Sequence, residues 1–389
     1  MTKEDKMRRT MWALAALGML LLAPAAMADW TPAKRLTWNS GTSGWAVVAA
    51  DSSSGVHLVW TDLTPGNFEV YYKKSTDGGA TWAAGQRLTS NSGSSGWAAI
   101  AVDSSSALHI LWEDDSPGNW DIYYAKSSDG GATWSTPQNF TSNDGDSHEV
   151  SIAADLSGNL HVAWHDNTPG NYEVYYRMSS DGGTSWTAAK RLTWTSGDSG
   201  SPDIAVDSSN HPHIVWQDST PGNQEIYYRK SDDAGGAGWS PPKRLSWNSG
   251  TSYYASLAVD QLGKVHVVWH DSTPGDHQLF YRNSTDGGSS WTPAQRLTWT
   301  TGWSFAPAVV SDSSNTLHLV WNFQGTPSEI FYKNSTDGGA AWSPRQRLSW
   351  TDFNPWRPDI AVDPFDNLHV VWHDDSPGNF EVYYRKFNK

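Results

Sequence analysis

The chain contains no cysteine, carries little basic charge and has no apolar run beyond its first residues that is long enough to cross a bilayer. Without cysteine there is no disulfide, so stability must come from the packed core. Its 27 Lys and Arg face 41 Asp and Glu, a formal net charge of −14. This acidic balance argues against nucleic acid and anionic membrane as partners, because both require a positive face.

The N-terminus has the pattern of a secretory signal peptide. A basic start is followed by the apolar stretch Met11–Leu22 and by small residues at Ala26-Met27-Ala28. We predict that residues 1–28 are removed, that the mature chain begins at Asp29, and that it is exported to the periplasm or out of the cell. The mature chain would then carry a net charge of −16, because the removed segment holds four basic and two acidic residues.

Tryptophan is abundant, with 25 residues, and its positions define an internal repeat. One Trp recurs at intervals of 51 to 53 residues: Trp60, Trp112, Trp164, Trp216, Trp269, Trp321 and Trp372. A second recurs at Trp30, Trp82, Trp134, Trp186, Trp239, Trp291 and Trp342. Seven units of about fifty residues are typical of a β-propeller, in which each blade is a four-stranded sheet.

Each unit contains four short β-branched and aromatic runs bounded by turn residues, as in 202–207, 213–216, 225–229 and 243–247. Residues 31–38 supply only a fourth strand, and residues 356–389 supply only the first three. The sequence therefore predicts an all-β, seven-bladed propeller of antiparallel strands, as one domain over residues 29–389. The N-terminal strand would complete the last blade and remove the open edge of the ring.

The turn between the third and fourth strands reads S-T-D-G-G-A-T-W at residues 75–82 and recurs six times, with one extra residue in the fourth copy. It resembles the Asp box, S-x-D-x-G-x-T-W, of the sialidase-like β-propellers, also called BNR-repeat proteins. Its carboxylate suits a tight turn, since Asp accepts backbone N–H bonds there and Gly tolerates positive φ. We assign a structural role to Asp77, Asp129, Asp181, Asp233, Asp286 and Asp337.

The resemblance implies an activity to test, because family sialidases are exo-glycosidases with an arginine cluster, a Tyr/Glu pair and an acidic residue. Most arginines here occupy repeated strand positions, and Arg357 alone is both unrepeated and suitably placed for such a site. The F-R-I-P-like motif of many sialidases is absent. This favours a protein without sialidase chemistry.

One set of positions does not repeat, at the start of each first strand: residues 44–45, 96–97, 148–149, 200–201, 253–254, 305–306 and 356–357. These should surround one mouth of the central channel, opposite the Asp boxes. Glu149, Tyr254 and Arg357 would form a polar cluster there with Asp203 and Asp359, the candidate catalytic set of the enzymatic alternative. The other interpretation is a plug of aromatic side chains that fills the mouth.

The loop between the second and third strands repeats as W-x-D-x-[ST]-P-G-N-x-[ED]. The next loop on the same face starts with Trp in five units. Asp and Asn beside Trp suit a sugar, whose C–H face stacks on the ring while its hydroxyls need donors and acceptors. The candidate ligand-binding residues are Trp38, Asp62, Asn67, Glu69, Asp114, Asn119, Asp166, Asn171, Glu173, Trp194, Asp218, Asn223, Glu225, Trp247, Trp350, Asp374, Asn379 and Glu381, with Trp299 at the same position as the other Trp residues. The alternative is hairpin chemistry, in which the same polar residues cap the turn.

Two histidine groups also recur, one within the second strand and one after its Trp, at His165, His270 and His373. Residues spread around a ring cannot converge on one ion, so we predict no metal and no cofactor. The leading hypothesis is an exported, non-catalytic propeller that binds a glycan or another repetitive extracellular ligand. The alternatives are a sialidase-like hydrolase and a scaffold for protein contacts. The sequence predicts no membrane span in the mature chain and no particular oligomeric state.

Overall fold

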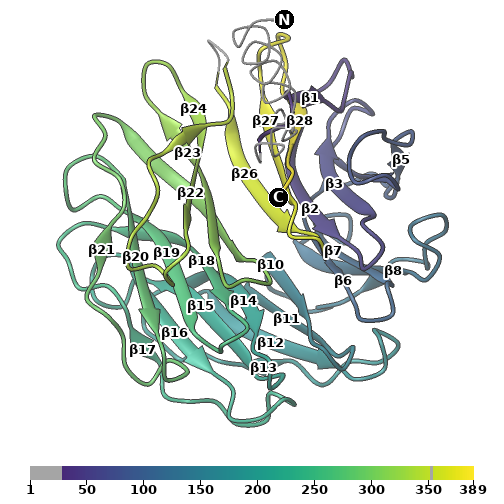
Figure 1. Ribbon diagram of the computed structural model, residues 1–389. Coiled ribbons are helices and arrows are strands. Elements are labelled where there is room, and N and C mark those ends of the chain that lie inside the picture. The colour runs from purple at the N-terminus through teal and green to yellow at the C-terminus, as the bar shows by residue number, and fades with distance from the viewer. Residues whose placement is uncertain (1–28, 351–353) are drawn as a thin grey trace, which may run out of the picture.

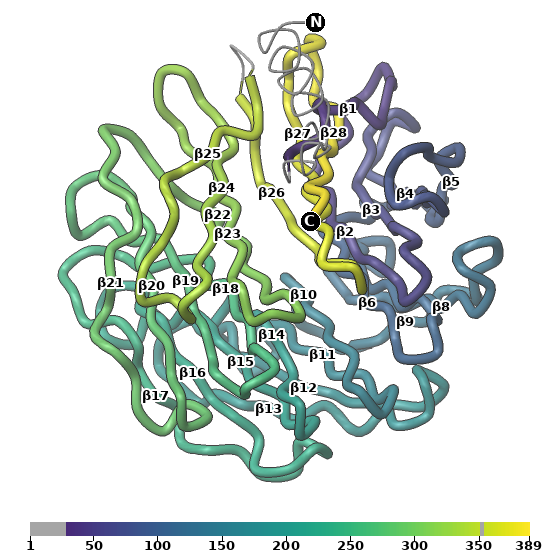
Figure 2. Tube along the Cα trace, in the orientation of Figure 1, coloured from purple at the N-terminus to yellow at the C-terminus, as the bar shows by residue number. Residues whose placement is uncertain are grey.

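The computed structural model describes residues 29–350 and 354–389, so the predicted signal peptide lies outside the described residues. Seven four-stranded antiparallel sheets form a ring (Figure 1). This confirms the predicted all-β, seven-bladed propeller. Figure 2 shows the chain passing from blade to blade around the ring, so that the last strands return to the first.

Each blade contributes an innermost, a second, a third and an outermost strand in chain order. The first three blades consist of β2 (Ser43–Ala50), β3 (Val56–Asp62), β4 (Glu69–Ser75) and β5 (Gln86–Arg87); β6 (Ser95–Val102), β7 (Leu108–Asp114), β8 (Asp121–Ser127) and β9 (Gln138–Asn139); and β10 (Ser147–Ala154), β11 (Leu160–Asp166), β12 (Glu173–Ser179) and β13 (Lys190–Arg191). Blades four to six consist of β14 (Ser199–Val206), β15 (Pro212–Asp218), β16 (Glu225–Lys230) and β17 (Lys243–Arg244); β18 (Ser252–Val259), β19 (Val265–Asp271), β20 (Gln278–Ser284) and β21 (Gln295–Arg296); and β22 (Trp303–Ser311), β23 (Leu317–Gln324), β24 (Glu329–Ser335) and β25 (Gln346–Arg347). Blade seven consists of β26 (Trp356–Val362), β27 (Leu368–Asp374), β28 (Glu381–Phe387) and β1 (Lys34–Arg35).

The ring closes as the sequence predicts. Lys34 of β1 pairs with Tyr384 of β28, and the purple β1 lies beside the yellow β28 in Figure 1. The indole of Trp30 packs against Tyr332 of blade six at 5.1 Å between ring centroids. Leu36 enters an apolar cluster that joins blades seven and one. The N-terminal segment is therefore held by both backbone pairing and side-chain packing.

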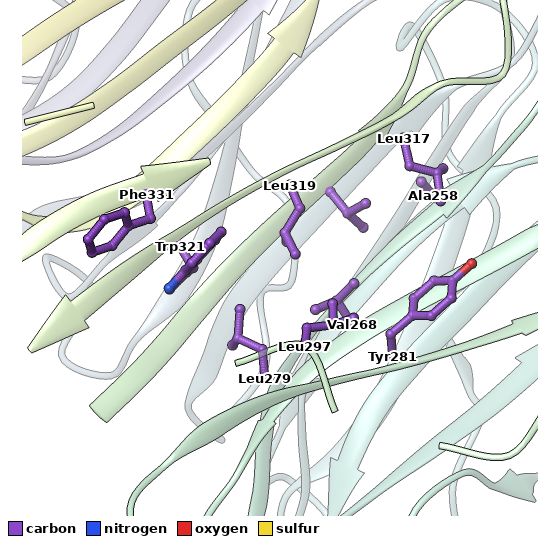
Figure 3. Packing of buried hydrophobic residues seen from close by; sticks show 10 residues of the cluster. Ala258, Val268, Leu279, Tyr281, Leu297, Leu317, Leu319, Trp321 and Phe331 are labelled. Carbon is purple, nitrogen blue, oxygen red and sulfur yellow. The ribbon is translucent and has the colours of Figure 1, made fainter. Parts of the chain in front are cut away.

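The second strand of each blade is buried along almost its whole length, because a neighbouring sheet covers each of its faces. The core is divided into seven clusters, one at each junction between blades. Figure 3 shows the cluster between blades five and six, where Trp321 and Leu319 of β23 face Val268 and Leu279 of blade five. The repeated Trp therefore works as a packing residue between blades.

The Asp boxes and the repeated histidines share the face opposite the variable ring. The carboxylate of Asp77 accepts the Thr81 hydroxyl at 2.6 Å, the Thr81 amide at 2.8 Å and the Ser75 hydroxyl at 2.7 Å, and these bonds lower its pKa. A Cβ on Gly79 would lie 1.8 Å from the Tyr384 hydroxyl, so only glycine fits there. The box is thus a turn that receives a tyrosine from the preceding blade.

That tyrosine belongs to a buried Asp–His–Tyr chain present in all seven blades. In blade one, His57 Nδ1 lies 2.8 Å from the Tyr72 hydroxyl, and Nε2 lies 3.2 Å from Asp51. Burial lowers the pKa of His57, while Asp51 opposes that shift. The ring of Tyr72 then packs edge-on against Trp134 of the next Asp box, at 5.1 Å. The strand-two histidines are therefore structural.

Candidate functional site

The variable ring surrounds a cavity of about 520 Å³ on the propeller axis. The second residue of each pair sits in a β-bulge of the innermost strand. All seven have positive φ, between 44° and 50°: Trp45, Trp97, Glu149, Ser201, Tyr254, Ala306 and Arg357. A bulge re-aims a side chain out of the regular alternation, and here it turns one residue per blade toward the cavity.

The polar cluster lies on one side of this cavity. The Arg357 guanidinium lies 5.4 Å from the centroid of the Tyr254 ring, and Ser201 donates its hydroxyl to Glu149. Burial raises the pKa of Tyr254, and the nearby Glu149 carboxylate adds to that shift. The structure therefore brings Glu149, Tyr254 and Arg357 to one cavity, as the sequence predicts.

Asp203 and Asp359 also line the cavity, but they serve as staples between innermost strands. Asp203 accepts the Leu257 amide of the next blade at 2.8 Å, and Asp359 accepts the Val48 amide at 2.8 Å. Burial raises the pKa of each carboxyl from 3.8 to about 6. Both side chains remain partly exposed to the channel.

Aromatic side chains cover the other side of the mouth. Trp45, Phe68, Trp97 and Trp120 form a chain of ring contacts with centroid distances of 5.4 to 6.4 Å. All four are half-buried. The aromatic rings therefore come from blades one and two, and Trp45 and Trp97 line the cavity together with the polar cluster.

The residue after each strand-two Trp has a role that the sequence did not reveal. In five of the seven blades it accepts the backbone amide of the bulge in the next blade, as His373 does for Trp45 at 3.4 Å and His165 does for Ser201 at 3.3 Å. Burial lowers the pKa of His165, His270 and His373 to about 3 in each case. His165 and His373 are therefore neutral hydrogen-bond acceptors at the blade junctions, whereas the buried Nδ1 of His270 has no hydrogen-bond partner among the described residues.

An ion pair that the sequence did not reveal joins blades two and three. Glu113 occupies the same acceptor position as His165, and its carboxylate lies 2.7 Å from His148 Nδ1. Burial alone would lower the pKa of His148, but Glu113 reverses the shift and raises it. A signal was available, because Glu113 is the one carboxylate at this repeated position.

The polar residues of the repeated loop are buried within the hairpins, which revises the prediction that they contact ligand. Asp62 is 0% exposed and accepts the Ser43 hydroxyl and the Thr64 amide, both at 2.8 Å. Asn67 donates to the Asn91 carbonyl at 3.2 Å. These groups are engaged by the fold, so the hairpin interpretation describes them better.

The third member of the set is an ion-pair partner. Glu69 is 0% exposed, and one of its oxygens lies 2.6 Å from Arg87 of the outermost strand. The equivalents of Asp62 in other blades are at most 2% exposed: Asp114, Asp166, Asp218 and Asp374. The equivalents of Glu69 are fully buried: Glu173, Glu225 and Glu381. The amides of Asn119, Asn171, Asn223 and Asn379 likewise donate to carbonyls of the next loop.

What the loops do expose is tryptophan, at the point where the outermost strand of a blade ends. Five indoles are 59% to 70% exposed: Trp38, Trp194, Trp247, Trp299 and Trp350. They belong to five consecutive blades, from three to seven, and Ser90 and Ser142 replace them in blades one and two. We call this set the tryptophan arc.

Each indole of the tryptophan arc lies beside the guanidinium of the Arg three residues before it, at 5.8 to 6.0 Å: Arg35, Arg191, Arg244, Arg296 and Arg347. Cations of the next blade approach three of the rings as well, with Arg385 at 4.8 Å from Trp350. Such contacts fix the orientation of the indole while leaving it open to solvent. The repeated R-L-[TS]-W sequence is the signal for this pairing.

The described residues contain no group of three or more His, Cys, Asp or Glu side chains that could hold a metal ion. Within the same residues, no helix has the length and apolar character needed to cross a membrane.

A model of the BNR repeat-like domain family matches residues 66–301. No curated protein sequence is significantly similar to the chain. Among solved structures, a protein of unknown function from Dyadobacter fermentans DSM 18053 is 15% identical with a TM-score of 0.57, covering 92% of this chain and 98% of that one. An ulvan lyase, titled a polysaccharide lyase, is 10% identical with a TM-score of 0.64, over 90% and 95% of the two chains. A Hadza microbial sialidase is 13% identical with a TM-score of 0.53, over 85% and 73%. At these identities the likeness concerns the fold.

Proposed function

The chain belongs to the BNR repeat-like domain family, and on that premise we propose that it binds carbohydrate without cleaving it. The supporting observation is the tryptophan arc, which exposes large aromatic surfaces in five consecutive blades. Exposed apolar groups that the core does not need mark binding surfaces. An indole offers an apolar face on which the C–H side of a pyranose stacks.

The repetition of the site suits a repetitive ligand. A polysaccharide that contacts several indoles gains affinity from multivalency, roughly 10²–10⁴ over one site where the geometry allows simultaneous contact. The name of the ulvan lyase refers to a polysaccharide, and the sialidase also carries a carbohydrate enzyme name, which supports a glycan as the ligand class here. The proposed partner is therefore an extracellular glycan, consistent with the predicted signal peptide.

The test is binding of the wild type and of a variant with the five arc tryptophans changed to Ala, measured on a panel of immobilised glycans. We expect the wild type to bind at least one glycan class and leave it uncleaved, and the variant to lose that binding while its thermal unfolding stays close to wild type. Equal binding by both proteins would refute the proposal.

A sialidase-like exo-glycoside hydrolase is the second candidate. It is favoured by the convergence of Glu149, Tyr254 and Arg357 on one cavity. Arg357 is the one arginine that lines this cavity among the described residues, whereas the family site uses an arginine cluster. Release of the fluorophore from a fluorogenic sialoside, abolished by Glu149→Gln or Arg357→Ala, would establish this activity; an inactive wild type would exclude it for that substrate.

Export stays a proposal that follows from residues 1–28. N-terminal sequencing of the protein recovered outside the cytoplasm should find Asp29 as the first residue. Recovery of the intact N-terminus in the cytoplasm would contradict it.

A further inference from the structure

Blade five differs from the other four blades of the tryptophan arc in the charge around its arginine. In those four blades the strand-four arginine pairs with a buried glutamate of the third strand, at 2.7 Å for Arg35, 2.7 Å for Arg191 and 2.8 Å for Arg244, and also at Arg347. These glutamates are at most 2% exposed. The charge of each of these four strand-four arginines is therefore balanced from inside the blade.

In blade five Gln278 occupies the position of that glutamate. The charge of Arg296 is therefore not neutralised by a buried carboxylate of the third strand. The Arg296 Nε donates to the Thr298 carbonyl at 2.6 Å, and the guanidinium lies 5.8 Å from the Trp299 ring. Within residues 29–350 and 354–389, no carboxylate lies within ion-pair distance of it. Trp299 is also the most exposed indole of the arc, at 70%.

The missing carboxylate has moved within the same hairpin. Blade five carries Asp276 where blades three, four and seven have asparagine, and this carboxylate accepts the Gly302 amide at 3.1 Å. Gln278 in turn donates to the Thr300 carbonyl at 3.0 Å, a carbonyl of the next loop that an asparagine contacts in blades three, four and seven. The amide and the carboxylate have thus exchanged places, which keeps the loop bonded but draws the negative charge away from Arg296.

A second cation lies close by. The amine of Lys333, from the third strand of blade six, donates to the Leu297 carbonyl at 2.8 Å, two residues before Trp299. Arg296 and Lys333 are both half-buried, so part of each is open to solvent. A guanidinium without a carboxylate partner offers a fork of N–H donors that matches a carboxylate or a sulfate in geometry and charge.

We propose that Trp299 and Arg296 form a site for a sugar residue that carries a carboxylate or a sulfate. The ring stacks on the indole of Trp299, and its anionic group pairs with Arg296. This inference rests on the proposed function and names the ligand class of one of its five sites. In the other four sites the strand-four arginine is already paired with glutamate and is not free to bind such a group.

The test substitutes Asp276 and Gln278 so that blade five regains the asparagine and glutamate found in blades three, four and seven. Asp276→Asn combined with Gln278→Glu restores the hairpin pattern of the other blades and leaves the net charge of the protein unchanged. The reciprocal control, Asn223→Asp combined with Glu225→Gln, gives blade four the arrangement of blade five. The affinity of the wild type and of both variants is measured for immobilised neutral, carboxylated and sulfated oligosaccharides. Thermal unfolding first shows that each protein is folded.

We expect the blade-five variant to lose roughly tenfold in affinity for carboxylated or sulfated glycans, the loss of about one charge-assisted hydrogen bond, with neutral glycans unchanged. The blade-four variant should gain affinity for the same anionic glycans. Unchanged anionic binding in the blade-five variant, or an equal loss for neutral glycans, would overturn the inference while leaving the proposed function intact. If neither the exchange nor Trp→Ala changes in the whole arc alter glycan binding, the proposed function itself fails.

Discussion

Asp359→Asn should stabilise the propeller above pH 7 and have little effect near pH 4. The Asp359 carboxylate accepts the Val48 amide at the junction of blades seven and one, where the ring closes. Its pKa is raised from 3.8 to about 6, first by burial and also by the neighbouring Asp203. An asparagine keeps an oxygen that accepts the amide and removes the charge.

The sign follows from proton linkage. The folded protein holds the proton of Asp359 up to about pH 6, whereas the unfolded chain releases it near 3.8. Stability therefore falls as pH rises between these values and levels off above the higher one. A pKa shift of roughly two units corresponds to a loss of about 3 kcal/mol in unfolding free energy as an upper limit. Because the Asp359 side chain is partly exposed to the channel, we expect a loss of about 1–2 kcal/mol.

The assay is the thermal unfolding midpoint of the variant minus that of the wild type, measured from pH 4 to pH 8. Titrating groups that do not interact with Asp359 cancel in this difference, which therefore reports Asp359 together with its coupling to Asp203. We expect it to rise by a few degrees between pH 4 and pH 7. Asp144→Asn, which removes one carboxylate at an exposed loop position, is the matched control. A flat or falling curve for Asp359→Asn would refute the assignment of a strained carboxylate at the ring closure.

Gly79→Ala should lower the unfolding free energy by about 2–4 kcal/mol, because the added Cβ would lie 1.8 Å from the Tyr384 hydroxyl. Gly66 also has positive φ, but a Cβ there would meet no atom within 4 Å, so Gly66→Ala should lower the unfolding free energy by about 1 kcal/mol only. Chemical denaturation of both variants separates the clash from the backbone strain, and equal losses would contradict this reading. Arg87→Met should lower the unfolding free energy by about 3 kcal/mol, because it leaves the buried Glu69 carboxylate without its ion-pair partner. The double variant Arg87→Met with Glu69→Gln should recover most of that loss. Deletion of residues 29–38 should abolish cooperative unfolding or lower its midpoint sharply, because it removes β1 and the Trp30 contacts; a midpoint near wild type would show that ring closure does not depend on this segment.

The fold could be predicted because its cause is repeated in the sequence. The period of the two Trp positions fixes the number of blades, and the split unit at the two ends indicates the closure by β1. The same argument placed the variable ring at the channel mouth, since symmetry forces equivalent positions to one axis. Strand lengths were less accessible: the outermost runs look five residues long, as in 243–247, but only Lys243–Arg244 pair with β16.

The polar loop residues show where sequence reasoning stops. Asp, Asn and Glu serve a turn and a sugar equally well, and composition alone does not separate the two uses. Coupled changes between repeats do. Blade two has Asp121 in place of glutamate and Asn139 in place of arginine, and these two shorter side chains remain bonded at 2.7 Å. A pair that changes together is a structural contact, whereas the exposed Trp varies between blades without disturbing the hairpin.

Glycan binding by the tryptophan arc is the central claim, and one titration tests it most directly. Intrinsic fluorescence of the wild type would be followed against a glycan selected from the panel, beside a variant in which Trp38, Trp194, Trp247, Trp299 and Trp350 are all alanine. The account predicts saturable binding by the wild type and a glycan that is unchanged afterwards. The variant lacks the reporter tryptophans, so its affinity is measured by calorimetry and should be at least a hundredfold weaker. Full affinity in the variant, or shortened glycan chains after incubation with the wild type, would contradict it.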